Sequence, residues 1–159
     1  MRTRRIVAAL VATLCALATL LIASISAQDH STSRELKLVY HDQPPVLPLP
    51  DTLNPEQFAQ NDPAFAAYTL AARVRRTLYQ IPCYCPCDKL KGHKSLLDCF
   101  ASNHGASCHI CQQETIFCFL HRRESASQIR KRIADGEAWT IDLSKSAQLL
   151  DAVKGATDK

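Results

Sequence analysis

The alternation of apolar and polar positions predicts helices after the first fifty residues or so. Over residues 64–80 the apolar side chains recur at steps of three and four, which is the repeat of one helix face, so we expect a single helix there. These side chains are Phe65, Tyr68, Ala72, Leu78 and Tyr79. Pro82 ends this helix, because a proline restricts the residue before it to extended geometry.

Capping signals mark further helices on both sides of this one. Asn54-Pro55-Glu56-Gln57 has an N-cap residue, a first-turn proline and a capping-box glutamine, so a short helix is expected there. Ser125 to Gln128 forms a second capping box, and the helix that follows is expected to run to Asp135 and to stop at Gly136.

The rest of the chain continues this helical pattern, with one irregular segment. Three further helices are expected, over residues 95–101, over residues 107–121 with Ser107 as the cap, and over residues 144–153. Residues 83–92 are expected to form a loop or a short strand. Since no β-hairpin pattern is present, the predicted fold class is all-α, a small helical domain around an irregular cysteine-rich loop.

The N-terminal pattern differs from the rest and predicts export. Three arginines among the first five residues precede an almost wholly apolar run and then small residues up to Ala27. That order predicts a signal peptide over residues 1–27, with an uncleaved membrane anchor as the alternative, because about 20 apolar residues span a bilayer. We therefore expect the protein in the periplasm or on the outer face of the cytoplasmic membrane.

Between the signal segment and the helices lies a stretch that is poor in core-forming residues. Residues 28–53 contain four prolines, which favour extended geometry, so a disordered linker is expected there. The predicted organisation is thus residues 1–27 as signal segment, residues 28–53 as linker and residues 54–155 as a cysteine-rich helical domain.

Charge narrows the possible partners. The chain has 19 basic and 15 acidic residues, and loss of residues 1–27 removes three basic residues and leaves 16 against 15. A chain so close to neutrality gives no argument for binding nucleic acid or an anionic membrane surface. We expect no nucleic-acid partner, and contact with a membrane only through the N-terminal segment if it stays uncleaved.

Seven of the eight cysteines follow the signal segment, and an odd number cannot pair completely within one chain. Three of them, Cys83, Cys85 and Cys87, alternate with other residues, and Pro86 favours extended geometry at Cys85. In an extended segment the three thiols share one face, with neighbouring Cα atoms about 6.5–7 Å apart, the outer limit for a disulfide. A metal ion with bonds of about 2.3 Å to each sulfur spans such a gap more easily.

A second pair of cysteines and two histidines complete the candidate site. If Ser107 caps a helix, Cys108 and Cys111 stand in its first turn, where the helix N-terminus stabilises the thiolate that binds metal. Cys99, His93 and His104 lie between the two halves, and each histidine stands next to a glycine, where its ring can turn inward. We expect Cys118 to be a buried core residue, and His109 and His121 to be weaker candidates.

Six cysteines and two histidines offer eight donors, the number that two tetrahedral ions need. The predicted metal ligands are Cys83, Cys85, Cys87, Cys99, Cys108, Cys111, His93 and His104. Zinc suits a closed site with mixed ligands and Cu(I) suits a close row of thiolates, so both metals remain open. The expected function is an exported metal-binding protein that sequesters its ion or exchanges it with a metal donor or acceptor protein.

Two alternatives come from the same cysteines. Compartments outside the cytoplasm oxidise thiols, so the segment also fits a disulfide-stapled surface interaction module. The Cys108-x-x-Cys111 pair at a helix start is also found in thiol–disulfide redox proteins, although no thioredoxin-like βαβ pattern surrounds it. No Ser/His/Asp elbow, phosphate-binding glycine loop or paired-carboxylate motif stands out, so we do not expect an enzyme.

A family resemblance rests on the same segment. The residues that carry it are Ile81-Pro-Cys-Tyr-Cys-Pro-Cys87, Gly92-His93-Lys94-Ser95, Asp98-Cys99-Phe100 and His104-Gly105-x-x-Cys108-x-x-Cys111. They resemble a bacterial family of exported proteins and lipoproteins named for a Pro-Cys-Tyr-Cys-Gly-Cys motif. Pro86 replaces the glycine of that motif here, and a lipobox is lacking. The resemblance implies that the six cysteines and two histidines act as one unit, but it names no substrate.

Overall fold

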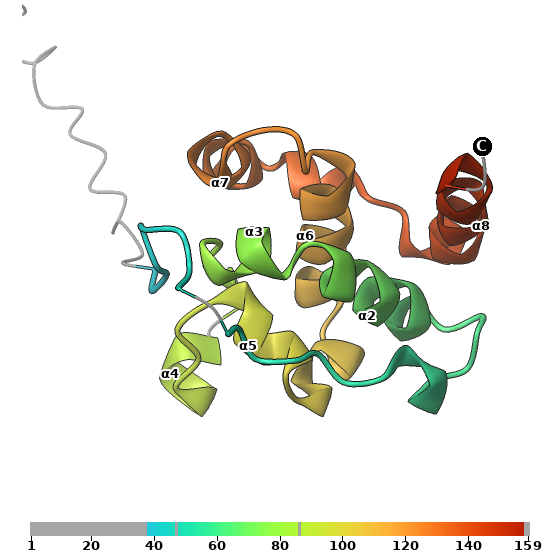
Figure 1. The fold of residues 1–159 in the computed structure, drawn as a ribbon, viewed down its shortest axis with the longest axis horizontal. Helices are drawn as coiled ribbons and strands as arrows, with labels where there is room; N and C mark the ends of the chain where they lie inside the picture. The colour runs from blue at the N-terminus through green and yellow to red at the C-terminus, as the bar shows by residue number, and fades with distance from the viewer. Residues whose placement is uncertain (1–37, 47, 86, 158–159) are drawn as a thin grey trace, which may run out of the picture. The chain divides into compact units, whose positions relative to one another are not determined.

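The computed structural model describes residues 38–46, 48–85 and 87–157 (Figure 1). The described residues form helices and turns and contain no strand, which confirms the predicted all-α class. The helices are α2 Pro63–Arg73, α3 Arg75–Tyr79, α4 Cys87–Lys91, α5 Leu96–Phe100, α6 His109–Leu120, α7 Ala126–Ala134 and α8 Ser146–Thr157. Short 3-10 turns are η1 Pro55–Gln57, η2 Asn103–Ser107, η3 Glu137–Thr140 and η4 Leu143–Lys145. The predicted signal segment and the first part of the predicted linker lie outside the described residues.

Several helix ends follow the capping signals of the sequence. The Asn54 side chain accepts a hydrogen bond from Glu56 N at 3.0 Å and caps η1, which is a 3-10 turn. Ser125 caps α7 with the capping box that its spacing to Gln128 predicts. Gly136, with a φ of +92°, follows α7 in the left-handed region, where glycine pays no steric penalty.

The prediction of a single helix over residues 64–80 is wrong. The helix breaks at Val74, whose φ of −126° and ψ of 24° lie outside the helical region, so α2 ends at Arg73 and α3 begins at Arg75. No glycine or proline marks this break. The residue that stands there is β-branched and has low helix propensity.

Two predictions for the cysteine segment also need correction. Residues 83–92 are not all loop, because Cys87 begins the one-turn helix α4, which ends before Gly92 at a φ of +71°. The cap of α6 is Cys108 and not Ser107, which belongs to η2. The polar residues before α6 thus form their own turn, and the helix starts one residue later than its capping signal suggests.

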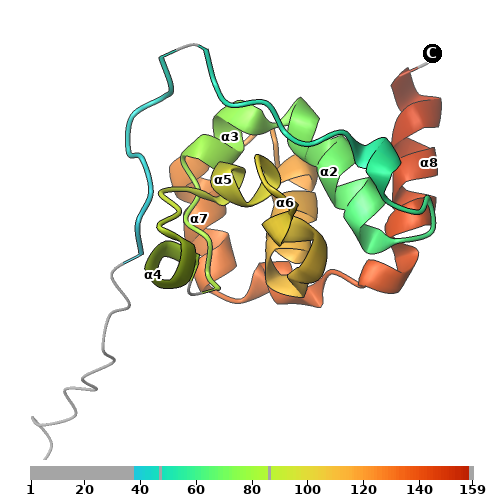
Figure 2. The same ribbon diagram turned by 90° about the horizontal axis from the view of Figure 1, so that it is seen from below.

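The core lies where α2 packs against α6, and α8 packs on α2 as well (Figures 1 and 2). Tyr68 and Leu70 of α2 are fully buried, and so are Ile116 and Cys118 of α6. Burial of apolar side chains at about 25 cal/mol per Å² is the main favourable term for such a pair. The helices α4 and α5 and the turn η2 carry most of the cysteine segment and lie toward one end of α6 (Figure 2).

The described part of the predicted linker, residues 38–46 and 48–53, has no helix or strand but makes contacts with the domain. His41 stacks on Tyr79 with ring centroids 3.9 Å apart, and Leu53 N donates to Phe100 O at 2.9 Å. These residues therefore lie along α3 and α5. None of the described helices is both long enough and apolar enough to cross a membrane.

Candidate metal centre

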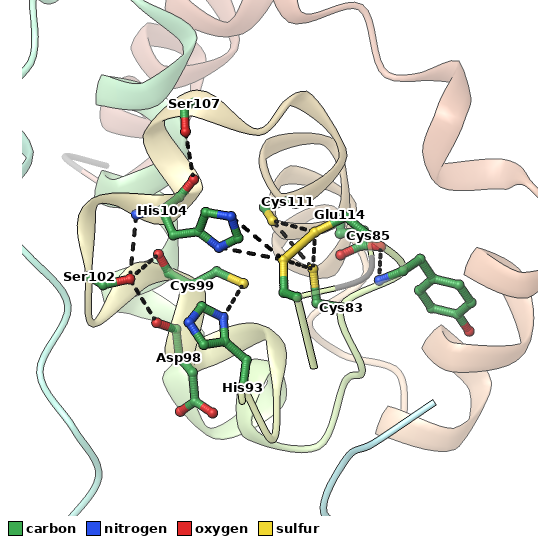
Figure 3. The surroundings of a disulfide bond; sticks show 12 residues. Cys83, Cys85, His93, Asp98, Cys99, Ser102, His104, Ser107, Cys111 and Glu114 are labelled. Carbon is green, nitrogen blue, oxygen red and sulfur yellow. Dashed lines mark hydrogen bonds between the residues drawn. A yellow bond between two sulfur atoms is a disulfide. The ribbon is translucent and has the colours of Figure 1, made fainter. Parts of the chain in front are cut away.

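The Cys83–Cys87 segment turns instead of extending. Cys87 N donates a hydrogen bond to Cys85 O at 2.7 Å, and the Cα atoms of these two residues are 5.5 Å apart. Their sulfurs are joined in a disulfide (Figure 3). The prediction of an extended row is wrong, because the segment turns at this point. The turn into α4 shortens the Cα separation to a value that is common for disulfides.

All eight predicted donors meet in one cluster around this turn. Three overlapping groups have ligand atoms within 4.8 Å of one another. The groups are Cys83, Cys87, Cys99 and Cys111; then Cys87, His93, Cys99 and His104; and then Cys85, Cys108 and Cys111. Figure 3 shows the labelled side chains of these groups converging from α5, α6 and the turns on either side of them.

Sulfur–sulfur distances in the cluster approach those of a metal–thiolate site. A tetrahedral ion with bonds of about 2.3 Å holds its sulfurs about 3.8 Å apart. Cys83 Sγ lies 3.3 Å from Cys111 Sγ and 3.6 Å from Cys87 Sγ, while Cys85 Sγ lies 3.8 Å from Cys111 Sγ. These sulfurs are therefore close enough for metal ligation once the Cys85–Cys87 disulfide is reduced.

The two histidines bring their rings to the same end of the cluster. His93 Nδ1 is 3.2 Å from Cys99 Sγ, and His104 Nδ1 is 3.4 Å from Cys87 Sγ. The ring centroids lie 5.2 Å apart in an edge-to-face arrangement, and both rings are half-buried. They line a hollow on the surface together with Lys91. Each imidazole can therefore ligate a metal that two cysteines hold from the other side.

Close packing fixes the His104 turn on α6. A Cβ on Gly105 would lie 3.0 Å from Phe100 Cε1 and 3.1 Å from Cys99 O, so the chain passes α5 at close approach and a larger residue would crowd it. The buried Gln112 donates from Nε2 to Gly105 O at 3.1 Å and to Ala106 O at 2.8 Å. The amide thereby ties η2, and with it His104, to the helix that carries Cys111.

Electrostatics lower the pKa of two thiols of the cluster, Cys83 and Cys108, and raise the pKa of two others, Cys99 and Cys111. Hydrogen bonds from the Cys111 and Cys99 thiols lower the pKa of Cys83 to about 3, although burial opposes the shift. The pKa of Cys108 falls to about 6, first because of a hydrogen bond from the Cys111 thiol and further because of backbone N–H groups in the first turn of α6. Hydrogen bonds to Cys108, Cys83 and Cys99 raise the pKa of Cys111, which is the donor of the set.

A buried carboxyl group stands beside the thiols, and sequence reasoning missed it. Glu114 is fully buried, its Oε1 accepts from Tyr84 N at 2.9 Å, and its Oε2 has no hydrogen-bond partner. Burial, followed by the nearby Cys83 charge, raises the pKa of Glu114 well above its ordinary value. The only sequence signal for it is its place three residues after Cys111, on the same side of α6.

The remaining candidates lie outside the donor groups. Cys118 is fully buried in the core, as the apolar residues around it predict, and burial raises its pKa well above the ordinary value. His109 is exposed, and His121 pairs with Glu124 at 2.8 Å. The cluster therefore contains the six cysteines and two histidines singled out by spacing, and none of these three residues.

The comparisons with known proteins place the chain without naming an activity. No curated protein and no solved structure shows significant similarity to it. A family model described as "Protein of unknown function with PCYCGC motif" matches residues 7–136, which is most of the sequence and includes the whole donor cluster. The chain therefore belongs to the PCYCGC family, as its motif indicates.

Proposed function

We propose that this protein binds Zn²⁺ or Cu(I) outside the cytoplasm, to sequester the ion or to pass it to another protein. One observation carries the proposal: eight soft or borderline donors, spread over residues 83–111, meet in three groups whose ligand atoms lie within 4.8 Å of one another. Such convergence is what a metal centre requires.

The chemistry of the donors restricts the metal. Thiolates and imidazoles bind zinc and Cu(I), whereas Mg²⁺ and Ca²⁺ need carboxylate or carbonyl oxygens. No carboxylate belongs to the groups formed by the described residues. The low pKa of Cys83, about 3, supplies a thiolate at neutral pH without any base. Zinc suits a structural role with the mixed donors, and Cu(I) suits the thiolates as cargo.

Export and partner are proposed from the sequence alone. The basic, apolar and small residues over positions 1–27 support export. If this segment stays uncleaved, it would anchor the domain on the outer face of the membrane. A protein that donates or accepts the ion is the expected partner. The absence of a catalytic motif in the sequence supports a binding role and not an enzymatic one.

A second candidate function, thiol–disulfide exchange, has one observation in its favour. Cys83 Sγ lies 3.1 Å from Cys85 Sγ, which is itself bonded to Cys87 Sγ. A thiolate at Cys83 can attack Cys85, form the Cys83–Cys85 bond and release Cys87 as thiolate, with no net oxidation. This isomerisation redistributes the disulfide but needs an external dithiol or disulfide before it becomes redox catalysis.

Elemental analysis of protein purified from its native compartment tests the metal proposal. We expect zinc or copper to copurify, and the double variant Cys83→Ser, Cys108→Ser to lose it. Cys118→Ala is the control, because this cysteine is buried but lies outside the donor groups. Metal-free protein with nearly all cysteines in disulfides, and with melting unchanged by the double variant, would favour the stapled interaction module.

A further inference from the structure

The eight donors divide into two sets of four, and we propose that each set binds its own metal ion. The mixed sub-site is the group Cys87, His93, Cys99 and His104, and the thiolate sub-site is the group Cys85, Cys108 and Cys111 together with the neighbouring Cys83. This inference rests on the proposed function, because it assigns stoichiometry and metal class to the same centre.

The overlap of the donor groups supports this division. If an ion takes the mixed group, the remaining donors still include the intact trio of Cys85, Cys108 and Cys111. Cys83 joins this trio, since its sulfur lies 3.1 Å from Cys85 Sγ and 3.3 Å from Cys111 Sγ. Both sets are then complete, and no donor is shared.

The alternative division leaves donors without an ion. A single ion in the all-cysteine group of four that includes Cys83 would take Cys87 and Cys99 from the histidines, and Cys111 from Cys85 and Cys108. His93 and His104 would then face only each other, and the two remaining cysteines belong to no other group among the described residues. Two ions therefore use every donor of the cluster, whereas one central ion uses half of them.

The two sub-sites differ in softness and in access. The mixed sub-site has two imidazoles at the surface hollow, and such a Cys₂His₂ set suits Zn²⁺. The thiolate sub-site has sulfur donors alone, and these favour the softer Cu(I) when both metals compete. Cys108 is half-buried at the N-cap of α6, while Cys83 and Cys85 are only 6% and 7% exposed. An incoming thiol ligand therefore meets the thiolate sub-site at Cys108.

The Cys85–Cys87 disulfide removes one donor from each sub-site. A dithiol reductant restores them: it gives two electrons and two protons, the sulfur–sulfur bond breaks into two thiols, and the reductant leaves as its own disulfide. Both sub-sites should therefore fill after reduction and empty together on oxidation. If a single ion were bound only by donors outside this disulfide, oxidation of the disulfide would not release the metal.

Native mass spectrometry of the full chain, reduced with a dithiol and titrated with Zn²⁺ and then Cu(I), tests the division. We expect two zinc ions per chain, of which Cu(I) displaces the one in the thiolate sub-site. His93→Asn with His104→Asn should lose one ion and keep the displaceable one. Cys85→Ser with Cys108→Ser should lose the displaceable ion and keep the other. His109→Asn and Cys118→Ala are the controls and should keep both.

A Co²⁺ titration of the unaltered chain gives a second readout that needs no variant to fold. Two ions should bind with different visible spectra, one typical of mixed sulfur and nitrogen ligands and one of sulfur alone. A single ion per chain, one uniform spectrum, or loss of both ions in either variant would overturn the division while metal binding stands. Failure to bind any of the three metals after reduction would overturn the division and the proposed function together.

Discussion

The helical scaffold around α2 and α6 and the cysteine segment, residues 83–94, are stabilised by different interactions. In α2 the buried side chains are apolar, including Phe65, Tyr68 and Leu70. Between Cys83 and Lys94, by contrast, the described side chains that are buried are the three cysteines, and Leu90 is 73% exposed. We therefore expect hydrophobic burial to stabilise the scaffold, and the proposed metal or a bond between sulfurs to stabilise the segment.

The largest expected effect comes from the scaffold. Leu70→Ala leaves a cavity where α2 meets the core, so the free energy of unfolding should fall by about 2–5 kcal/mol, both with and without metal. Leu90→Ala is the control and should change little, because this side chain is exposed. Denaturant titrations of the two variants measure the difference. If added metal fully rescued Leu70→Ala, the scaffold would not be independent of the centre.

Metal removal should be the next largest change. Binding to the folded state alone stabilises it by about 2.7 kcal/mol when the free ion stands about 100 times above its dissociation constant. Hydrogen exchange should then lose protection over residues 83–94 in the stripped protein, while α2 and α6 keep theirs. Equal loss of protection in the segment and in α2 would contradict the contrast between the two regions.

Two glycines with positive φ provide a matched pair, one in each region. Alanine at Gly92 meets no atom within 4 Å, and alanine at Gly136 makes only an ordinary contact of 3.6 Å with Trp139 Cδ1, so the penalty in each case is backbone strain of about 1–2 kcal/mol. Gly136→Ala should lower the melting temperature equally with and without metal. Gly92→Ala should lower it only in the metal-loaded protein, where the segment is held in place. Calorimetry of both variants in both states decides between these patterns.

The smallest predicted effect concerns a hydrogen bond between α2 and the turn that follows α5. The Tyr68 hydroxyl of α2 donates to Ser102 O at 2.5 Å, so Tyr68→Phe should cost about 1 kcal/mol. Burial raises the pKa of Tyr68 from its ordinary value near 10 to about 12. The contribution of this hydroxyl is therefore present below pH 10 and is lost as the pH rises toward 12.

Unfolding measurements across this alkaline range test this contribution. The free energy of unfolding should fall less steeply in Tyr68→Phe than in the unaltered protein, because the variant has no phenol to ionise at this position. Tyr79→Phe, at a half-buried tyrosine that stacks on His41, is the control and should keep the steep fall. Identical slopes in all three proteins would show that the Tyr68 hydroxyl does not contribute in this way.

What the sequence predicts well is local. The all-α class follows from apolar residues at helical spacing, and the cap of α7 follows from Ser125 and Gln128. The eight donors could be chosen from spacing because Cys-x-Cys, Cys-x-x-Cys and histidines beside glycines are short-range patterns. In each case the information lies within a few neighbouring residues.

What the sequence does not predict depends on contacts between distant residues. The break at Val74 has no proline or glycine signal, and the turn into α4 ends the extended row that the spacing of the three cysteines predicts. Glu114 meets Tyr84 across 30 positions of the chain, and Gln112 holds the η2 turn from α6. Only the packing of α6 against the cysteine segment brings these groups together.

X-ray absorption at the metal edge, on reduced and metal-loaded protein, tests the central claim most directly because it identifies the atoms bound to the ion. With zinc in both sub-sites, we expect a shell dominated by sulfur at about 2.3 Å with a smaller nitrogen shell at about 2.0–2.1 Å. His93→Asn with His104→Asn should remove most of the nitrogen shell. A shell of oxygen and nitrogen without sulfur would contradict the assignment of the Cys/His cluster as the metal centre.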